Sequence, residues 1–370
     1  MGQLPTVEDV ARVASVSRQT VSNVLNSPAI VKPDTRSRVE EAIKQLGYRQ
    51  NASARRLRTQ KSATIGIRLD PTTNGISGSI LDRFLHALTE QADQRGMRVL
   101  LFTAVDPEGE IEQIRRLRDG SDVDAFVLTS TFYGDPRTQW LIDNHVPFVT
   151  FGRPWGIDDM NDPQHLWVDV DGRAGTYAAT NHLIDGGARR VCYLGWPSPS
   201  GTGDDRRRGW ADAMRERFGL EAHELEQLER RTDEGVAQAT ATVSALFDSD
   251  PAPDALVCVS DSLALGAMIA AASAGLSGLP IIGFDNTPVA EAVGLSSVEQ
   301  SLKEVAAGAL ELLMGLTGSD LIARELASGE AHRLIMPELV IRGPNHFPVF
   351  ENRTTGDQER RRHHTGEETQ

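Results

Sequence analysis

From residue 62 onward the chain alternates short apolar runs with stretches of helical periodicity, and this alternation restricts the fold more than any other feature. The apolar runs are ATIGIRL (63–69), MRVLLFT (97–103), VDAFVLTS (123–130), HVPFVTFG (145–152), LWVDV (166–170), VCYLGW (191–196), ALVCVS (255–260), LPIIGF (279–284) and PELVI (337–341). Near-continuous apolar strands separated by helices predict parallel sheets covered on both faces. Roughly 280 such residues exceed one ordinary domain, so we expect an α/β core of two doubly wound lobes. Such sheets bind ligands at the carboxyl ends of their strands, so facing lobes would enclose a cleft.

The segment TVEDVARVASVSRQTVSNVLN, residues 6–26, predicts two short helices joined by a tight turn. Thr6 can cap the first helix with Asp9 three residues later, in the manner of a capping box. Ser17 is a natural N-cap for the second helix. The apolar stripe of the first helix consists of Val7, Val10, Ala11 and Ala14.

The outer face of the second predicted helix carries Arg18, Gln19, Ser22, Asn23 and Asn26. Arg suits guanine O6 and N7, and Gln or Asn suits adenine N6 and N7, so this face fits the major groove of B-DNA. The alternative is a small helical hairpin with a solvated polar face, because helix-turn-helix spacing also arises by chance.

Charge is divided unevenly along the chain. A third helix is predicted from Pro33 to Gly47, and YRQNASARRLRTQKS (48–62) then brings a basic run without an acidic residue. Residues 1–61 hold 11 Lys and Arg against 5 Asp and Glu, while the remainder holds 27 against 47. Contact with a polyanion is therefore expected only at the basic head, although the whole chain has a net charge of −14.

The head, the basic run and the start of the core together resemble the lactose/galactose repressor family. Members of this family are bacterial regulators with a helix-turn-helix head and a sugar-binding-protein-like core. The matching pieces are DVARVASVSRQTVSNVLN, TRSRVEEAIKQLGYRQN and NASARRLRTQKSATIGI, and the resemblance continues to about residue 343. It implies an all-α head over 1–50, a hinge helix and linker over 51–61 and a two-lobed, periplasmic-binding-protein-like core over 62–343. The lobes would be 62–152 with 296–317, and 167–285 with 333–343, with crossings near 153–166, 286–295 and 317–333.

The resemblance also implies roles in DNA binding. Arg18, Gln19 and Asn23 stand where the family reads bases in the major groove, and Ala54 and Leu57 of the hinge helix would enter the minor groove. The phosphate-contacting positions are Thr6, Ser17, Thr20, Ser22, Asn26 and Asn51. The hinge helix, 51–57, is far below the roughly 12–15 residues that an isolated helix needs, so we expect it to form only when paired and laid on DNA.

Effector-binding positions follow in the same way. DDRRRGW (204–210) offers Arg206 as an anchoring cation, and GFDN (283–286) offers Asp285 as an acceptor for ligand hydroxyls. The other positions implied are Arg153, Trp155, Trp167 and Ser260. A cation and a carboxylate suit a polyol, and flat aromatic faces stack on sugar rings. Residues 70–78 lack the aromatic loop common in the family, and Trp210 equally fits simple packing of its helix.

Other classes of protein are disfavoured. Cys192 and Cys258 lie in strand-like runs and are expected to be buried free thiols in a reducing cytoplasm. No apolar run approaches a membrane span, and Met1–Pro5 offers no signal-peptide core. VDVDG (168–172) fits a strand end better than a metal loop, and no catalytic set can be assembled, so we expect no metal, cofactor or enzymatic activity.

The sequence therefore predicts a cytoplasmic, sequence-specific transcription regulator, a repressor of carbohydrate genes that a small sugar releases from operator DNA. Trp content favours a di- or oligosaccharide as effector. The tail, 344–370, is expected to be disordered, and it lacks the leucine heptads of a tetramer, so a homodimer is the economical assembly. Alternatives are a ligand that strengthens operator binding, a solute-binding protein without regulatory function, or an enzyme that turns the sugar over.

Overall fold

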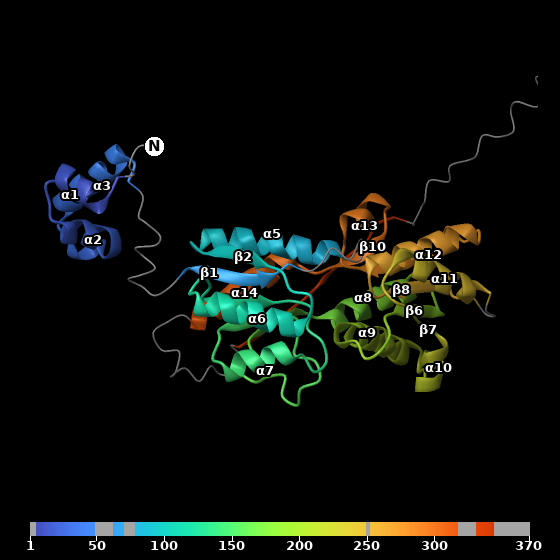
Figure 1. The fold of residues 1–370 in the computed structure, drawn as a ribbon. Coiled ribbons are helices and arrows are strands. Elements are labelled where there is room, and N and C mark those ends of the chain that lie inside the picture. The colour runs from blue at the N-terminus through green and yellow to red at the C-terminus, as the bar shows by residue number, and fades with distance from the viewer. Residues whose placement is uncertain (1–4, 49–61, 70–77, 249–251, 317–330, 344–370) are drawn as a thin grey trace, which may run out of the picture. The chain divides into compact units, whose positions relative to one another are not determined.

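The computed structural model describes residues 5–48, 62–69, 78–248, 252–316 and 331–343 (Figure 1). The chain divides into two compact units, Met1–Ser62 and Ala63–Gln370. The first unit contains α1 (Val7–Val13), α2 (Arg18–Asn26), a short 3-10 turn (Pro28–Ile30) and α3 (Pro33–Leu46).

The predicted ends of the head helices are confirmed. Thr6 and Asp9 form the capping box at the start of α1, with Asp9 Oδ2 accepting from the Thr6 N–H at 2.9 Å. Ser17 caps α2, and Gly47 ends α3 in the left-handed conformation. Ser15, in the turn between α1 and α2, also has a positive φ of 53°.

The head has its own small core. Val10, Val21 and Val39, one from each helix, are fully buried. Because this apolar stripe faces inward, Arg18 and Gln19 of α2 are left exposed.

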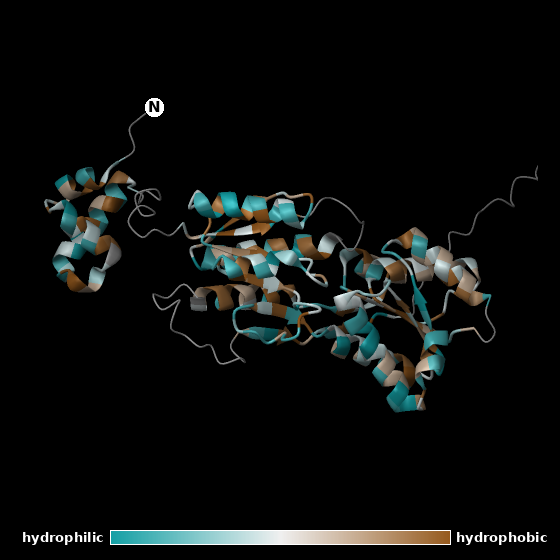
Figure 2. Ribbon diagram, turned by 60° about the horizontal axis from the view of Figure 1, so that its bottom comes forward, coloured by the Kyte–Doolittle hydropathy of each residue, from teal (hydrophilic) through white to brown (hydrophobic). Residues whose placement is uncertain are grey.

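The first lobe of the second unit is a parallel six-stranded sheet of order β11-β5-β4-β3-β1-β2. Its strands are β1 (Thr64–Arg68), β2 (Arg98–Phe102), β3 (Ala125–Leu128), β4 (Phe148–Phe151), β5 (Trp167–Val170) and β11 (His332–Ile335). Helices α5 (Gly78–Gln94) and α14 (Leu302–Leu316) pack together over one face, and α6 (Pro107–Asp119) and α7 (Pro136–Asp143) cover the other. Figure 2 shows these helices with hydrophilic and hydrophobic residues interspersed, as expected for helices that cover a sheet.

The second lobe is a six-stranded sheet of order β12-β10-β9-β8-β6-β7. Its strands are β6 (Val191–Gly195), β7 (Glu229–Arg231), β8 (Ala255–Cys258), β9 (Ile281–Phe284), β10 (Ser296–Glu299) and β12 (Glu338–Val340). The helices are α8 (Gly172–Asp185), α9 (Gly201–Phe218), α10 (Ala222–Gln227), α11 (Val236–Phe247), α12 (Asp261–Ser273) and α13 (Pro288–Ala292). β12 runs antiparallel to β10, an exception to the parallel pattern that the sequence predicted.

The crossings between the lobes differ from those expected. The chain leaves the first sheet after β5, near Asp171, returns after β10, at residues 300–301, and leaves again after β11, at residues 336–337. β5 was expected in the second lobe, but it pairs with β4 and β11, so it belongs to the first. β10 was expected in the first lobe, but it pairs with β9 in the second.

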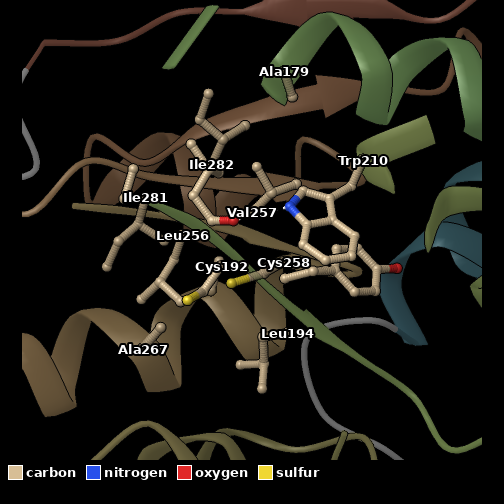
Figure 3. Close-up of a cluster of buried hydrophobic side chains, with 14 of the residues drawn as sticks. Ala179, Cys192, Leu194, Trp210, Leu256, Val257, Cys258, Ala267, Ile281 and Ile282 are labelled. Carbon is tan, nitrogen blue, oxygen red and sulfur yellow. Dashed lines mark hydrogen bonds between the residues drawn. The ribbon is translucent and has the colours of Figure 1, made fainter. Parts of the chain in front are cut away.

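Figure 3 shows how the second lobe buries its apolar side chains. Ala179 and Trp210 lie on one side of the strands and Ala267 on the other. Trp210 is fully buried, stacks on Tyr193 and donates from Nε1 to the Val191 carbonyl at 3.0 Å, so it is a packing residue. Cys192 and Cys258 are buried free thiols, as predicted, and burial raises the pKa of Cys192 to about 11, which disfavours the reactive thiolate.

Candidate functional site

A cleft of about 450 Å³ lies at the carboxyl ends of strands from both sheets. The first lobe contributes residues 130–133 after β3, residues 151–153 at the end of β4, and Asp169. The second lobe contributes Trp196 after β6, the first turn of α9, and Asp285 after β9. This position follows from the rule that parallel sheets bind ligands where their strands end.

Aromatic side chains line the cleft from both lobes. Phe132 and Tyr133 come from the loop after β3, and each leaves about two-fifths of its surface exposed, at 41%. Trp196 comes from the second lobe, where its Nε1 donates to Glu234 Oε2 at 2.7 Å. The Ser260 hydroxyl donates to the same carboxylate at 2.9 Å, so Glu234 is held from two sides.

Arg153 connects the two lobes electrostatically. Its Nε donates to Asp169 Oδ2 at 2.7 Å in the first lobe, and its Nη2 donates to Asp205 Oδ2 at 2.5 Å on α9 of the second. Its guanidinium also lies 4.5 Å from the ring centroid of Trp155. These carboxylates raise the pKa of Arg153 despite its burial, so the residue keeps its charge.

Arg206 and Asp285 form the charged pair of the second lobe. Arg206 Nη1 lies 3.5 Å from Asp285 Oδ1 and donates to the Val259 carbonyl at 2.6 Å, while its guanidinium sits 3.6 Å over the Phe284 ring. The Nε atom of Arg206 is buried and has no hydrogen-bond partner among the described residues. Buried polar atoms are normally satisfied, so Arg206 Nε is an exception to the usual pattern.

Asp285 is held in an unusual state. Its Oδ1 accepts from Gln300 Nε2 at 2.5 Å, and its backbone φ of 110° lies in a region that side chains rarely adopt. Desolvation by burial raises its pKa to about 7, against the opposing attraction of Arg206.

Some residues predicted for the cleft do not line it. Trp167 is buried at the start of β5, donates to the Met160 carbonyl at 2.8 Å and stacks on His332, so it packs at the opposite end of its strand from Asp169. Ser260 is fully buried and caps α12 while it donates to Glu234, so it supports the wall rather than the ligand. A serine is found at this position because it caps a helix, and serine is common both at helix N-caps and in ligand pockets.

Trp155 lies behind the cleft wall. It is buried, and a Cβ at Gly201, a residue that lines the cleft, would overlap its ring. Of the positions predicted to bind an effector, Arg153, Arg206 and Asp285 are the ones that line the cleft directly.

Other lining residues were not predicted. Phe132 and Tyr133 directly follow the apolar run 123–130, so the strand-end rule alone would have found them. Gln300, which lines the cleft, and Glu234, which lies behind Trp196, carry no comparable signal, because each reaches its partner only through tertiary packing.

The outer face of α2 is the second candidate site. Arg18 and Gln19 are exposed, with Arg18 Nη1 3.1 Å from Glu8 Oε1 and Gln19 Nε2 donating to Asn23 Oδ1 at 3.0 Å. Exposed ion pairs of this kind contribute little to stability, so these side chains can exchange partners readily.

The predicted phosphate-contacting residues gather around the helix starts. Thr6 and Ser17 are caps, the Thr20 amide donates to Ser17 Oγ at 3.1 Å, and Ser22 is partly buried on α2. The side chain of Asn26 and all of Asn51, Ala54 and Leu57 lie outside the described residues, as do residues 70–77 and 344–370.

The described ranges give no support for a metal site or a membrane-spanning helix. No cluster of His, Cys, Asp and Glu there has the arrangement of a metal site, and no helix there has the length and apolar character needed to cross a membrane. Asp169 pairs with Arg153, and Asp171 caps α8, which accounts for the VDVDG segment.

A helix-turn-helix head and a two-lobed core with a polar cleft define a class of ligand-binding, DNA-binding proteins. Residues 6–51 match the family of bacterial regulatory proteins called the lacI family, and residues 180–343 match a periplasmic binding protein-like domain. The HTH-type transcriptional regulator CelR of Thermobifida fusca is 32% identical over 296 residues, which are 78% of this chain and 84% of that protein. The regulator AglR of Rhizobium meliloti is 31% identical over 84% of this chain and 87% of its own. The chain thus belongs to the LacI family and is a DNA-binding transcription regulator rather than an enzyme.

Solved structures agree with this assignment. A LacI-family regulatory protein from Chloroflexus aggregans is 34% identical, with a TM-score of 0.66, and the match covers 76% of this chain and 97% of that one. The complex of the transcriptional regulator CelR with cellobiose is 26% identical, with a TM-score of 0.63, over 92% of this chain and all of the other.

Proposed function

We propose that the protein is a cytoplasmic, homodimeric repressor of genes for carbohydrate uptake or use, and that a small sugar in the cleft controls its hold on operator DNA. The observation that carries the proposal is the facing pair of Arg206 and Asp285 between aromatic walls. A cation and a carboxylate are strong hydrogen-bond partners for hydroxyl groups in a poorly hydrated site. Trp196, Phe132 and Tyr133 supply the flat apolar faces on which sugar rings stack.

The charges of the cleft favour an uncharged ligand. Among the described lining residues, Arg153 is already paired with Asp169 and Asp205, and Arg206 with Asp285. An anionic ligand such as a sugar phosphate would meet carboxylates that already neutralise both guanidinium groups. The cleft volume of about 450 Å³ falls within the roughly 300–1,000 Å³ of small-molecule sites, which suits a disaccharide.

The proposed DNA contacts follow the exposed face of α2. Arg18, Gln19 and Asn23 would reach base edges, and Thr6, Ser17, Thr20, Ser22, Asn26 and Asn51 would contact phosphates. Two heads of a homodimer would read the halves of a near-palindromic operator. Ala54 and Leu57 would enter the central minor groove, with Leu57 as the wedge that kinks the duplex.

Thermal denaturation with a panel of neutral and phosphorylated sugars, led by cellobiose, tests the ligand assignment. Cellobiose is the first probe because a CelR relative was solved in complex with it. A ligand at about 100 times its dissociation constant adds roughly 2.7 kcal/mol of stability, which is readily measured. A response confined to sugar phosphates would contradict the uncharged ligand, and no response to any sugar would contradict carbohydrate control.

Operator binding is tested on a duplex selected by the protein from random sequence. Arg206→Ala should bind this duplex yet fail to respond to the sugar. The sign of the wild-type response separates an inducer, which weakens DNA binding, from a co-repressor, which strengthens it. The coupling expected is about 1–3 kcal/mol in either case.

A further inference from the structure

Arg83 joins the first lobe to the backbone of the second. It lies on α5, and its Nη1 donates to the carbonyl oxygens of Asp285 at 3.2 Å and Asn286 at 3.0 Å. Its Nη2 donates to Glu299 Oε1 at 3.0 Å. A single side chain of the first lobe therefore contacts the segment after β9 and the last residue of β10.

The backbone that Arg83 contacts is strained. Asp285 has a φ of 110° and Asn286 a φ of 44°, both in the left-handed region. Such residues persist only where surrounding contacts hold them, and they concentrate at functional sites. Asn286 is held further by Ser297, Glu299 and Arg342, at 2.9, 2.6 and 2.7 Å respectively.

The same segment belongs to the cleft and to a lobe crossing. The side chain of Asp285 lines the cleft, whereas its carbonyl group accepts from Arg83. Glu299 directly precedes the crossing at residues 300–301, where Ser301 also has a positive φ of 47°. A rearrangement of the lobes must therefore move the groups that Arg83 holds together.

We propose that Arg83 is a positioning residue that fixes the backbone of Asp285 and Asn286 and thereby couples occupation of the cleft to helix α5. The inference rests on the proposed function, since it concerns how the same cleft signals to DNA. The planar, forked guanidinium group suits Arg83 to this role, because it contacts two carbonyl oxygens and one carboxylate at once.

The positioning role is tested in the ligand-free protein by amide hydrogen exchange. Arg83→Gln should speed exchange at Asp285, Asn286 and Thr287 by at least about tenfold, because local opening follows the loss of tertiary contacts. Arg83→Lys should do the same, since an ammonium group can replace the ion pair with Glu299 but not the forked contact. Wild-type exchange in either variant would overturn the proposal.

Arg95→Gln is the matched control. Arg95 directly follows α5, but it bonds within the first lobe, to the Gln91 carbonyl at 3.1 Å and near Glu311 at 3.5 Å. Its replacement should leave exchange at residues 285–287 unchanged. Faster exchange there in Arg95→Gln as well would show general loosening of α5 and overturn a specific role for Arg83.

The coupling role is tested with saturating cellobiose, or with whichever sugar of the panel stabilises the wild type. Saturation removes any effect on sugar affinity, so the ratio of operator affinities without and with sugar reports coupling alone. This ratio should shrink toward one in Arg83→Gln and Arg83→Lys and stay at the wild-type value in Arg95→Gln. A wild-type ratio in the Arg83 variants would overturn the coupling. A wild type that ignores every sugar would refute the proposed function and the coupling with it, whereas the exchange result would still decide the positioning role.

Discussion

Trp196 and Glu234 meet at the wall of the cleft, where the indole Nε1 donates a hydrogen bond of 2.7 Å to Glu234 Oε2. Trp196 lines the cleft, whereas Glu234 is not among its lining residues. The orientation of the aromatic face thus depends on a carboxylate behind it, and Ser260 holds that carboxylate in turn.

Glu234→Ala should weaken disaccharide binding by about tenfold, because one hydrogen bond contributes about 0.5–1.5 kcal/mol and its loss frees the Trp196 ring. Titration calorimetry with cellobiose measures the change. Glu234→Gln keeps an acceptor for the indole and should retain most of the affinity. In a Trp196→Phe background Glu234→Ala should cost almost nothing, and an undiminished loss there would show that Glu234 acts elsewhere.

Gly201→Ala should destabilise the core by about 1–3 kcal/mol, because the added methyl group overlaps the buried Trp155 ring. Urea denaturation measures the loss. Gly315→Ala is the control, since Gly315 lies in α14, where no atom of the described residues beyond its own helix backbone and chain neighbours lies within 4 Å of the added Cβ, and alanine favours helices. Equal stability changes in the two variants would contradict the steric argument.

The raised pKa of Asp285 should make the free energy of unfolding depend on pH. Burial raises its pKa from 3.8 to about 7, so folding takes up a proton and the stabilisation, present in full below pH 3.8, is lost as pH rises through 7. The wild type should therefore lose stability relative to Asp285→Asn between pH 5 and pH 7, with a limiting slope of about 1.4 kcal/mol per pH unit.

Denaturation of both proteins across this pH range measures the difference. His165 titrates with the opposite sign, because burial lowers its pKa to about 4, but it is common to both proteins and cancels. Parallel curves for wild type and Asp285→Asn would contradict the raised pKa.

Gln19→Ala should cost about 1–3 kcal/mol at one base position and relax sequence preference there. Fluorescence anisotropy against the selected operator, and against duplexes with single base changes, measures this. Glu41→Ala, at an exposed position of α3, should leave the preference intact. A uniform loss on every duplex would assign Gln19 to phosphate contact instead of base reading.

The elements that the sequence predicted well are those with local signals. Thr6 with Asp9, Ser17, Pro33 and Gly47 mark helix ends through contacts within a turn, and all of them mark helix ends in the structure. The helix at 78–94 carries a local signal of another kind, because Ile80, Phe84 and Leu88 recur at helical spacing and are buried in the structure. Such elements can be predicted from the sequence because the residues that stabilise them are close together along the chain.

Strands with polar sequences were missed. β7 (ERR), β10 (SSVE) and β11 (HRLI) have few apolar residues, and each is a strand because a neighbour offers its backbone. The lobe crossings were misplaced for the same reason, since the sheet to which β5 or β10 belongs depends on distant pairing. Likewise, Trp167 and Trp196 are one residue type, and only tertiary position separates a packing role from a place in the cleft.

The last described segment completes both sheets, since β11 pairs with β5 in one and β12 with β10 in the other. A chain cut short before His332 would lack one edge strand in each lobe. Two exposed backbone ladders, on β5 and β10, would then invite pairing with other copies, so premature termination here should yield insoluble aggregates rather than a half-functional product. The two last described strands, β11 and β12, are therefore required for a soluble protein.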